Sequence, residues 1–445
     1  MTRWACAIAL LVQLAGSSVA MPQPINAPAQ AATTPLAAAP TNAEPAPKIT
    51  AYTLPPALYA KAKTLGTIRF AFRLFSFFFA LFALWLILRT RLSATFRNWA
   101  EAATRFRFLQ AFIYTPLFAL AFALLQLPLD LFNESLFKRY GISVQTWPSW
   151  TADWLKAELL TMLIGSIFAW ILFTVIRRSP RRWWFYFWTI SIPISLFIFF
   201  LQPLVIDPLF NQFAPLSAKA PELIPQLERI TIRGGMPIPP ERMFWMLASD
   251  KTIYTNAYVT GIGATKRVVI WDTSLTKETT GGILTMFGHE MGHYALHHVW
   301  KGLAFVSAIF FLLLYLGYRT IDWLLARYRD SWSLRGVDDW AALPALLLLV
   351  TFFGFAASAI LNTFSRFQEN QADIYSLEVT HGILPDPGQD CAISFQKFGE
   401  QVFVDPRPNP VNVFLFFDHP TVTDRVHLCV TYDPWSQGHP PQFVQ

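Results

Sequence analysis

Two histidines and a glutamate at close spacing are the residues of this chain best suited to catalysis. The segment FGHEMGH places His289 and His293 four residues apart, with Glu290 directly after the first histidine. On a helix, residues four apart share a face, so both imidazoles can bind one zinc ion. Glu290 projects beside them and can take a proton from a water that the metal activates. The alternative is an amphipathic helix that carries two surface histidines.

A catalytic zinc ion keeps three protein ligands and one open position, so a third ligand is needed. The segment SRFQENQAD supplies Glu369 as the candidate carboxylate, and Asp373 lies four residues further on, on the same helical face. Asp373 would accept a proton from a ligand imidazole and so fix its tautomer. Alternatively, both acids only solvate the end of a helix.

The elements that must position these residues are membrane helices. Of the 445 residues, 54% are hydrophobic and only 14% are charged, which excludes a disordered chain, a nucleic-acid-binding tail protein and an ordinary cytosolic enzyme. A helix needs about 20 apolar residues to cross about 30 Å of hydrocarbon. Six apolar segments meet or approach that length, at 68–88, 108–127, 155–176, 183–205, 302–318 and 340–361.

Arginine-rich loops predict the orientation of these spans. The loops after the first, third and fifth spans carry thirteen of the 35 Lys and Arg residues: Arg89, Arg91, Arg97, Arg105, Arg107, Arg177, Arg178, Arg181, Arg182, Arg319, Arg327, Arg329 and Arg335. Because cytoplasmic loops carry the excess of Lys and Arg, this face is predicted to be cytoplasmic. Residues 206–301 and the C-terminal tail then lie on the exported side. The net charge of +7 therefore does not indicate nucleic acid.

The N-terminus predicts export as well. Arg3 gives a basic start, an apolar run follows, and Ser18 and Ala20 have the small side chains that a signal peptidase reads. We interpret residues 1–20 as a cleaved signal peptide and 21–50 as a Pro/Ala-rich linker. The alternative is an anchor helix that stays uncleaved.

Several further segments, in order along the chain, resemble the type I CAAX prenyl endopeptidase family of integral-membrane zinc metalloproteases. Beside HEMGH and SRFQENQAD, they are KRYG at 138–141, IDPLFN at 206–211, NAYVTG at 256–261, and His419-Pro420 followed by Arg425. The resemblance covers about residues 51–435. It implies a mainly α, polytopic α-helical membrane protein with a small α+β zinc metalloprotease domain.

The resemblance also implies boundaries within the chain. A membrane domain with four spans would occupy 51–205, and the first half of the protease domain, with the HExxH helix, 206–301. Two further spans would occupy 302–361. The second half of the protease domain, with the third ligand, would occupy 362–435, and a tail 436–445.

Each motif residue gains a role from this resemblance. One zinc ion per chain would be bound by His289, His293 and Glu369, with Glu290 as the general base. Asn256 and Arg425 would contact the substrate. His419 would stabilise the oxyanion, since a cationic group can stabilise developing negative charge where little water is present. Asp373 and His298 would support the metal ligands from behind.

The sequence also predicts a β-hairpin beside the metal helix. β-branched and aromatic residues around Gly261 indicate strands at 254–258 and 267–271. An exposed edge there could pair with an extended peptide, although a hairpin that merely packs on the metal helix would look the same.

Cysteine usage leaves two alternatives. Cys391 and Cys429 remain once the signal peptide has gone. In an oxidising compartment they could form a disulfide that joins two helices of the tail region. Otherwise they are two buried thiols.

We therefore expect an integral-membrane zinc endopeptidase that hydrolyses peptide bonds. Its partners would be peptide or protein substrates, lipidated or not, and membrane lipid, without nucleic acid. Eukaryotic members of the family have seven spans and this chain has six, which would place the zinc site on the periplasmic side of a bacterial inner membrane. Alternatives are a quality-control protease that cleaves non-prenylated proteins, a zinc-binding pseudoprotease, and a transporter. The filled catalytic positions argue against a pseudoprotease, and the scarcity of charges inside the spans weakens the transporter.

Overall fold

Six long helices dominate the computed structural model, which describes residues 48–261 and 266–444. The predicted signal peptide and most of the linker lie outside these residues. The long helices are α2 (Pro56–Arg89), α4 (Arg107–Arg139), α5 (Trp147–Arg178), α6 (Trp183–Leu201), α11 (His298–Trp332) and α12 (Leu343–Thr380). All six are apolar and long enough to cross a membrane, and α6 continues as a helix to Phe210. The predicted mainly α membrane fold is confirmed.

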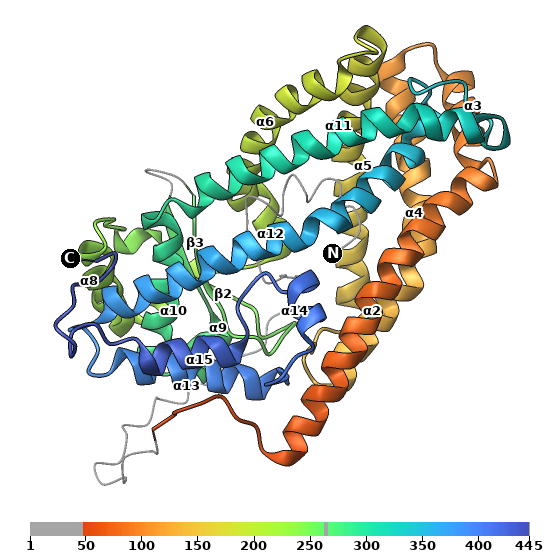
Figure 1. The fold of residues 1–445 in the computed structure, drawn as a ribbon. Helices are drawn as coiled ribbons and strands as arrows, with labels where there is room; N and C mark the ends of the chain where they lie inside the picture. The colour runs from red at the N-terminus through yellow and green to blue at the C-terminus, as the bar shows by residue number, and fades with distance from the viewer. Residues whose placement is uncertain (1–47, 262–265, 445) are drawn as a thin grey trace.

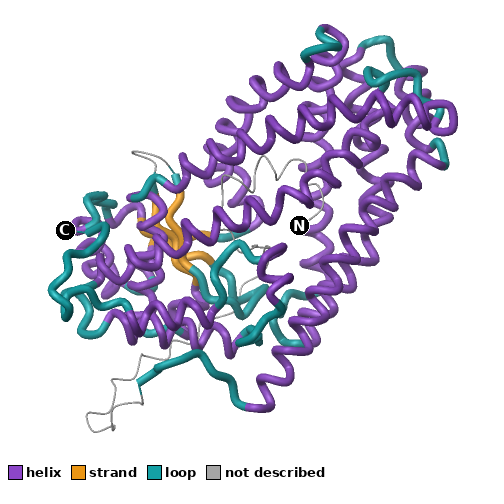
Figure 2. Tube along the Cα trace, in the orientation of Figure 1, coloured by secondary structure: helices purple, strands orange, loops and turns teal. Residues whose placement is uncertain are grey.

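The chain divides into a helical half and a half that contains all the strands of the described residues (Figures 1 and 2). Helices α11 and α12 each extend through both halves. Each continues as a helix beyond the apolar run that predicted it, and the last turns of α12 carry Glu369 and Asp373. Two acids of the candidate site therefore lie on a helix that also forms a membrane span.

The arginine-rich loops meet at the opposite end of the molecule, where α3 (Leu92–Ala103) lies (Figure 1). Arg97 and Asp339, both buried, form an ion pair of 2.5 Å between the first and third of these loops. Arg335 adds a second ion pair with Glu101, at 2.9 Å. The common face that the sequence predicted for these loops is thus held together by charge.

The shorter elements surround a small mixed sheet. Its order is β1 (Phe213–Pro215), β2 (Met243–Met246), β4 (Arg267–Trp271) and β3 (Ala257–Thr260), and β2 and β4 are its parallel pair. The helices of this half are α7 (Asp207–Phe210), α8 (Ile224–Arg233), α9 (Asp272–Lys277), α10 (Thr280–Ala295), α13 (Pro387–Gln401), α14 (Pro410–Phe416) and α15 (Val422–Thr431).

One predicted strand is displaced from its expected position. The structure begins β3 at Ala257, not at Tyr254, because the preceding backbone is bonded elsewhere. Tyr254 donates its backbone N–H to the Thr252 hydroxyl at 3.1 Å, and Asn256 donates its own to the Ser274 hydroxyl at 2.7 Å. Strand β3 is an edge of the sheet and lies beside α10, where the Tyr294 hydroxyl donates to the Val259 carbonyl at 3.4 Å.

A disulfide joins Cys391 of α13 to Cys429 of α15. Of the two alternatives that the sequence left open, the structure has the bridge. It lies in a small apolar cluster with Leu377 of α12 and Val426 of α15. The bridge therefore fixes α15 close to the helix that carries Glu369.

Candidate metal centre

Helix α10 carries the HExxH segment and packs unusually closely against α12. A Cβ added at Gly292 would lie 3.1 Å from the Cα of Ala372, and one at Gly288 would lie 3.3 Å from the Cα of Ser376. Both distances are shorter than ordinary contacts, so a side chain at either position would require the facing backbone to shift. The two glycines, four residues apart on one face, let the histidines of α10 reach the acids of α12.

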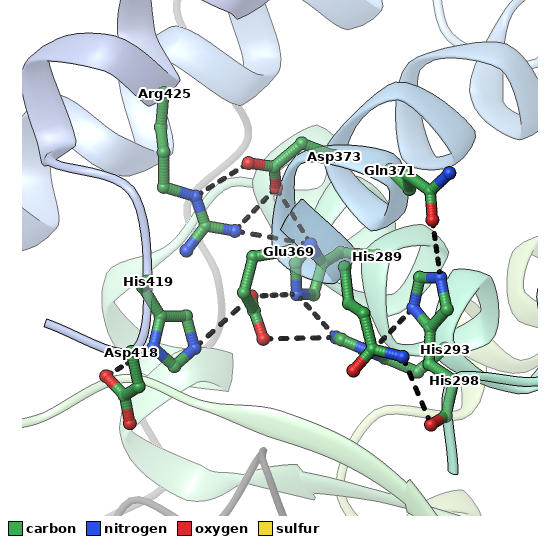
Figure 3. A network of polar contacts seen from close by, with 10 residues as sticks. His289, His293, His298, Glu369, Gln371, Asp373, Asp418, His419 and Arg425 are labelled. Atoms are coloured by element: carbon green, nitrogen blue, oxygen red, sulfur yellow. Dashed lines mark hydrogen bonds and ion pairs between the residues drawn. The ribbon is translucent and has the colours of Figure 1, made fainter. Parts of the chain in front are cut away.

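His289, His293 and Glu369 converge as predicted (Figure 3). The Nε2 atoms of the two histidines are 3.2 Å apart. One Glu369 oxygen lies 3.1 Å from His289 Nε2, and the other lies 3.5 Å from His293 Nε2. All three side chains are buried. The ligand atoms that the sequence proposed thus face one common point.

The donor set fits a metal ion. Glu369 is 1% exposed, and neither of its carboxylate oxygens accepts a hydrogen bond within the described ranges. A buried carboxylate that accepts no hydrogen bond is costly, and His419 contacts only one of its oxygens, at 3.3 Å. A cation held between Glu369 and the two imidazoles would reduce that cost. Two imidazole nitrogens and a carboxylate are also a donor set that metallopeptidases use.

His289 is supported by a charged pair. Its Nδ1 lies 2.8 Å from Asp373 Oδ1, and Arg425 donates to both oxygens of that carboxylate, at 2.8 and 2.5 Å. A carboxylate accepts, so His289 Nδ1 carries the proton and Nε2 presents its lone pair to the site. Burial alone would lower the pKa of His289, but Asp373 and Glu369 raise it to about 10. The two carboxylates thus make this imidazole strongly basic, which suits its Nε2 lone pair to binding a cation.

His293 is supported by a neutral chain instead. Its Nδ1 lies 3.2 Å from His298 Nδ1, and His298 Nε2 lies 3.1 Å from the amide oxygen of Gln371. The amide oxygen only accepts, so neutral His298 donates from Nε2 and accepts at Nδ1. His293 must then donate from Nδ1, which leaves its Nε2 lone pair facing the site. Burial lowers the pKa of His293 to about 3, in keeping with a neutral imidazole.

Local backbone geometry places His298 for this contact. His297 has φ of 58°, in the left-handed region, and turns the chain sharply between α10 and α11. The first residue of α11 is thereby brought back against His293. The side chain of His297 itself is exposed.

Glu290 and His419 complete the polar groups around the centre. Burial raises the pKa of Glu290 to about 7. His419, in the loop after α14, lies with its Nε2 3.3 Å from Glu369 and its Nδ1 2.9 Å from Asp418. Burial alone would lower the pKa of His419, but Glu369 and Asp418 raise it above its ordinary value. These two carboxylates therefore favour the protonated form of the imidazole.

The two residues that the sequence assigned to the substrate lie in different settings. The Arg425 guanidinium is engaged by Asp373, behind His289, so its observed contact supports a metal ligand. Asn256 precedes the edge strand β3, and Ser274 fixes its backbone on both sides, at 2.7 and 2.8 Å. Within the described part of the chain, Asn256 has no hydrogen bond to the metal-site residues.

Sequence reasoning missed Gln371, Asp418 and the two packing glycines. Gln371 lies inside the ENQAD segment, but its partner is on α11, seventy-three residues away. The only available signal for Gly288 and Gly292 was their spacing of four residues within the HExxH helix.

Long apolar helices joined to an HExxH helix with a convergent buried acid define a membrane-embedded metallopeptidase. The comparisons with known proteins agree. The family model described as "CAAX prenyl protease N-terminal, five membrane helices" matches residues 38–212, and that of peptidase family M48 matches 217–430. The chain belongs to peptidase family M48, and it is an integral membrane metalloendopeptidase acting on peptide or protein substrates. The resemblance found in the sequence is confirmed.

Individual relatives support the same assignment. An "Uncharacterized metalloprotease YhfN" from Bacillus subtilis (strain 168) is 38% identical over 358 residues, covering 78% of this chain and 79% of the relative. A "CAAX prenyl protease 1 homolog" from Dictyostelium discoideum is 27% identical over 65% of each chain. The crystal structure of S. mikatae Ste24p has the same fold, with a TM-score of 0.72 and 20% identity over 85% of this chain and 90% of that one.

Proposed function

We propose that this chain is a zinc metalloendopeptidase in which Glu290 is the general base. The observation that carries the proposal is the convergence of the buried Glu369 carboxylate, whose oxygens accept no hydrogen bond from the described residues, with two imidazoles whose outer nitrogens hold their protons. His289, His293 and Glu369 would hold one zinc ion. When bound, zinc supplies Lewis acidity and lowers the pKa of water toward neutrality.

The protein's own residues would then move protons and stabilise charge. Glu290, with its pKa raised to about 7, is suited to take a proton from the attacking water and give it to the leaving amine. His419, held cationic by Glu369 and Asp418, would stabilise the carbonyl oxygen as it gains negative charge. Strand β3 would hold the peptide by main-chain hydrogen bonds, with Asn256 at its start.

The candidate substrates differ in lipidation. Relatives are named CAAX prenyl proteases, which favours a prenylated protein. The exported orientation favours non-prenylated membrane or envelope proteins and a role in quality control, because the prenyl group is added in the cytoplasm. Products from prenylated and unmodified forms of one peptide should be compared by mass spectrometry, with Glu290→Gln as control. Cleavage by wild type and none by the variant supports the proposed mechanism, whereas equal cleavage by both would refute it.

We also propose that the metal centre faces the periplasm of a bacterial inner membrane. The support is that the arginine-rich loops meet at the end opposite the site, and that the site half contains a disulfide. A reporter active only in the cytoplasm, fused to the C-terminus, should be inactive. Activity of that reporter would reverse the orientation and leave the proposed chemistry untouched.

A further inference from the structure

Helix α2 carries two arginines that form no ion pair with any acid of the described residues. Arg69 and Arg73 lie one turn apart in an apolar helix whose most hydrophobic window has a mean hydropathy of 2.2. Within residues 48–261 and 266–444, neither guanidinium has a hydrogen bond or an ion pair, and Nε and Nη2 of Arg69 are buried. A charge in a membrane helix is costly and is normally paired. Asp418 attracts Arg73 from beyond ion-pair distance, so the two neighbouring charges remain available to bind an anion.

Both arginines are turned toward protein. The Arg69 guanidinium lies 4.8 Å from the ring centroid of Phe137 on α4. The Arg73 guanidinium lies 5.6 Å from the ring centroid of Phe416 on α14, which also packs edge-on against Phe70 of α2 at 6.1 Å. Helices α2 and α14 lie side by side at this point (Figure 1). Arg69 is thus partly buried beside α4, whereas Arg73 is exposed beside α14, where a ligand can reach it.

Arg73 also packs against the segment that leads to the metal centre. Phe416 is followed within three residues by His419, whose imidazole reaches Glu369. Arg366 of α12 fixes this segment by donating to the carbonyls of Val413 and Phe417, at 3.1 and 2.5 Å. Arg73 thus packs against the same short segment that presents His419 to the site.

The surroundings are rich in hydrogen-bond donors. The Ser76 hydroxyl lies on the same face of α2, one turn beyond Arg73, and is buried without a partner among the described residues. Guanidinium groups bind carboxylates through two parallel hydrogen bonds, which stabilise the pair more than neutral hydrogen bonds do. Apolar rings around the two arginines would strengthen such a contact, because the local dielectric constant is low.

We propose that Arg69 and Arg73 form a carboxylate-binding subsite for the peptide substrate. The carboxylate is a C-terminal one or an acidic side chain of the chain that is cleaved. This subsite rests on the proposed peptidase function and adds a specificity that the metal centre alone does not provide.

The test measures peptide binding without cleavage. Full-length protein carrying Glu290→Gln is placed in phosphatidylcholine nanodiscs and titrated with fluorescent peptides of one sequence. The peptides have a free or amidated C-terminus and an internal Glu or Gln. The peptide with the recognised carboxylate should bind about tenfold more tightly than its neutral counterpart. Adding Arg69→Gln and Arg73→Gln should remove this difference and leave binding of the neutral peptide unchanged.

Matched variants separate recognition from folding. Arg89→Gln, at the far end of the same helix, removes a positive charge and should keep the carboxylate preference. Equal binding of all four peptides before the arginines are changed would overturn the subsite. So would a double variant that weakens charged and neutral peptides equally, because that is a structural effect.

Two further measurements separate the peptide subsite from a lipid-binding site and from a failure of the proposed peptidase function. Nanodiscs with phosphatidylglycerol test the lipid phosphate as the anion: if the arginine pair changes only the lipid dependence, the peptide subsite is wrong. Cleavage by the wild-type protein is assayed in parallel. Cleavage without any carboxylate preference would refute the subsite alone, whereas absence of cleavage of every peptide would count against the proposed function.

Discussion

The two imidazoles of the candidate metal centre share one helix but have different supports. Behind His289 lies a charged pair, Asp373 with Arg425, and behind His293 lies a neutral chain through His298 to Gln371. A carboxylate behind a ligand imidazole raises its basicity, whereas a neutral acceptor mainly fixes its orientation. The difference indicates that His289 contributes more to metal affinity and that His293 contributes more to alignment.

Asp373→Asn should lower zinc affinity more than any of the other changes described below. The change removes the carboxylate behind His289 and leaves Arg425 buried without its counter-charge. Zinc affinity should fall about 10–100-fold, measured by competition with a chromogenic chelator. Thermal unfolding of the metal-free protein should be followed as well, since an unpaired buried charge also destabilises the fold. Unchanged zinc affinity would show that the charged support does not tune the ligand.

Gly292→Ala should weaken zinc binding through both histidines, because both lie on the helix that the change displaces. The new methyl group would lie 3.1 Å from the Cα of Ala372, so α10 and α12 must separate. We expect a loss of about 1–3 kcal/mol in the free energy of unfolding, measured by denaturant titration in detergent, and weaker zinc binding. Gly317→Ala is the matched control, because nothing lies within 4 Å of a Cβ added there. Equal stability of the two variants would contradict the close packing of the helices.

Gln371→Glu should make the two supports more alike. A carboxylate would then lie behind His298, and His293 would become a stronger donor. Zinc release to excess chelator should slow by several-fold, an effect smaller than that of Asp373→Asn. Gln371→Leu, which removes the acceptor, should speed release. Identical release rates in both variants would mean that the neutral chain has no influence on the metal.

Loss of the disulfide should have the smallest effect on zinc affinity of these four changes, and it should act through the support of His289 alone. Cys429 lies four residues after Arg425 on α15, so the bridge to α13 helps to hold the arginine at Asp373. Replacing both cysteines by Ser should lower the free energy of unfolding by about 2–4 kcal/mol. Zinc affinity, measured below the unfolding transition, should fall only slightly. A large loss of zinc would show that the bridge, and not the ion pair, positions Arg425.

Much of this architecture could be predicted from the sequence. The six spans follow from apolar length alone. His289 and His293 follow from residue type and spacing, whereas the choice of Glu369 over its alternative rests on the family resemblance. The role of Arg425 at Asp373 and the contact of Gln371 with His298 could not be predicted, because each joins residues far apart in the sequence. The start of strand β3 could not be predicted either, because the N–H groups of Tyr254 and Asn256 donate to the side chains of Thr252 and Ser274.

Zinc content measured together with cleavage tests the central proposal most directly. Purified protein should contain one zinc ion per chain by elemental analysis, and peptide cleavage should disappear when a chelator removes it. One equivalent of zinc should restore cleavage in the wild type, whereas Glu290→Gln should bind the same equivalent and remain inactive. Cleavage that persists in the metal-free protein, or that Glu290→Gln retains, would contradict a zinc peptidase with Glu290 as its base.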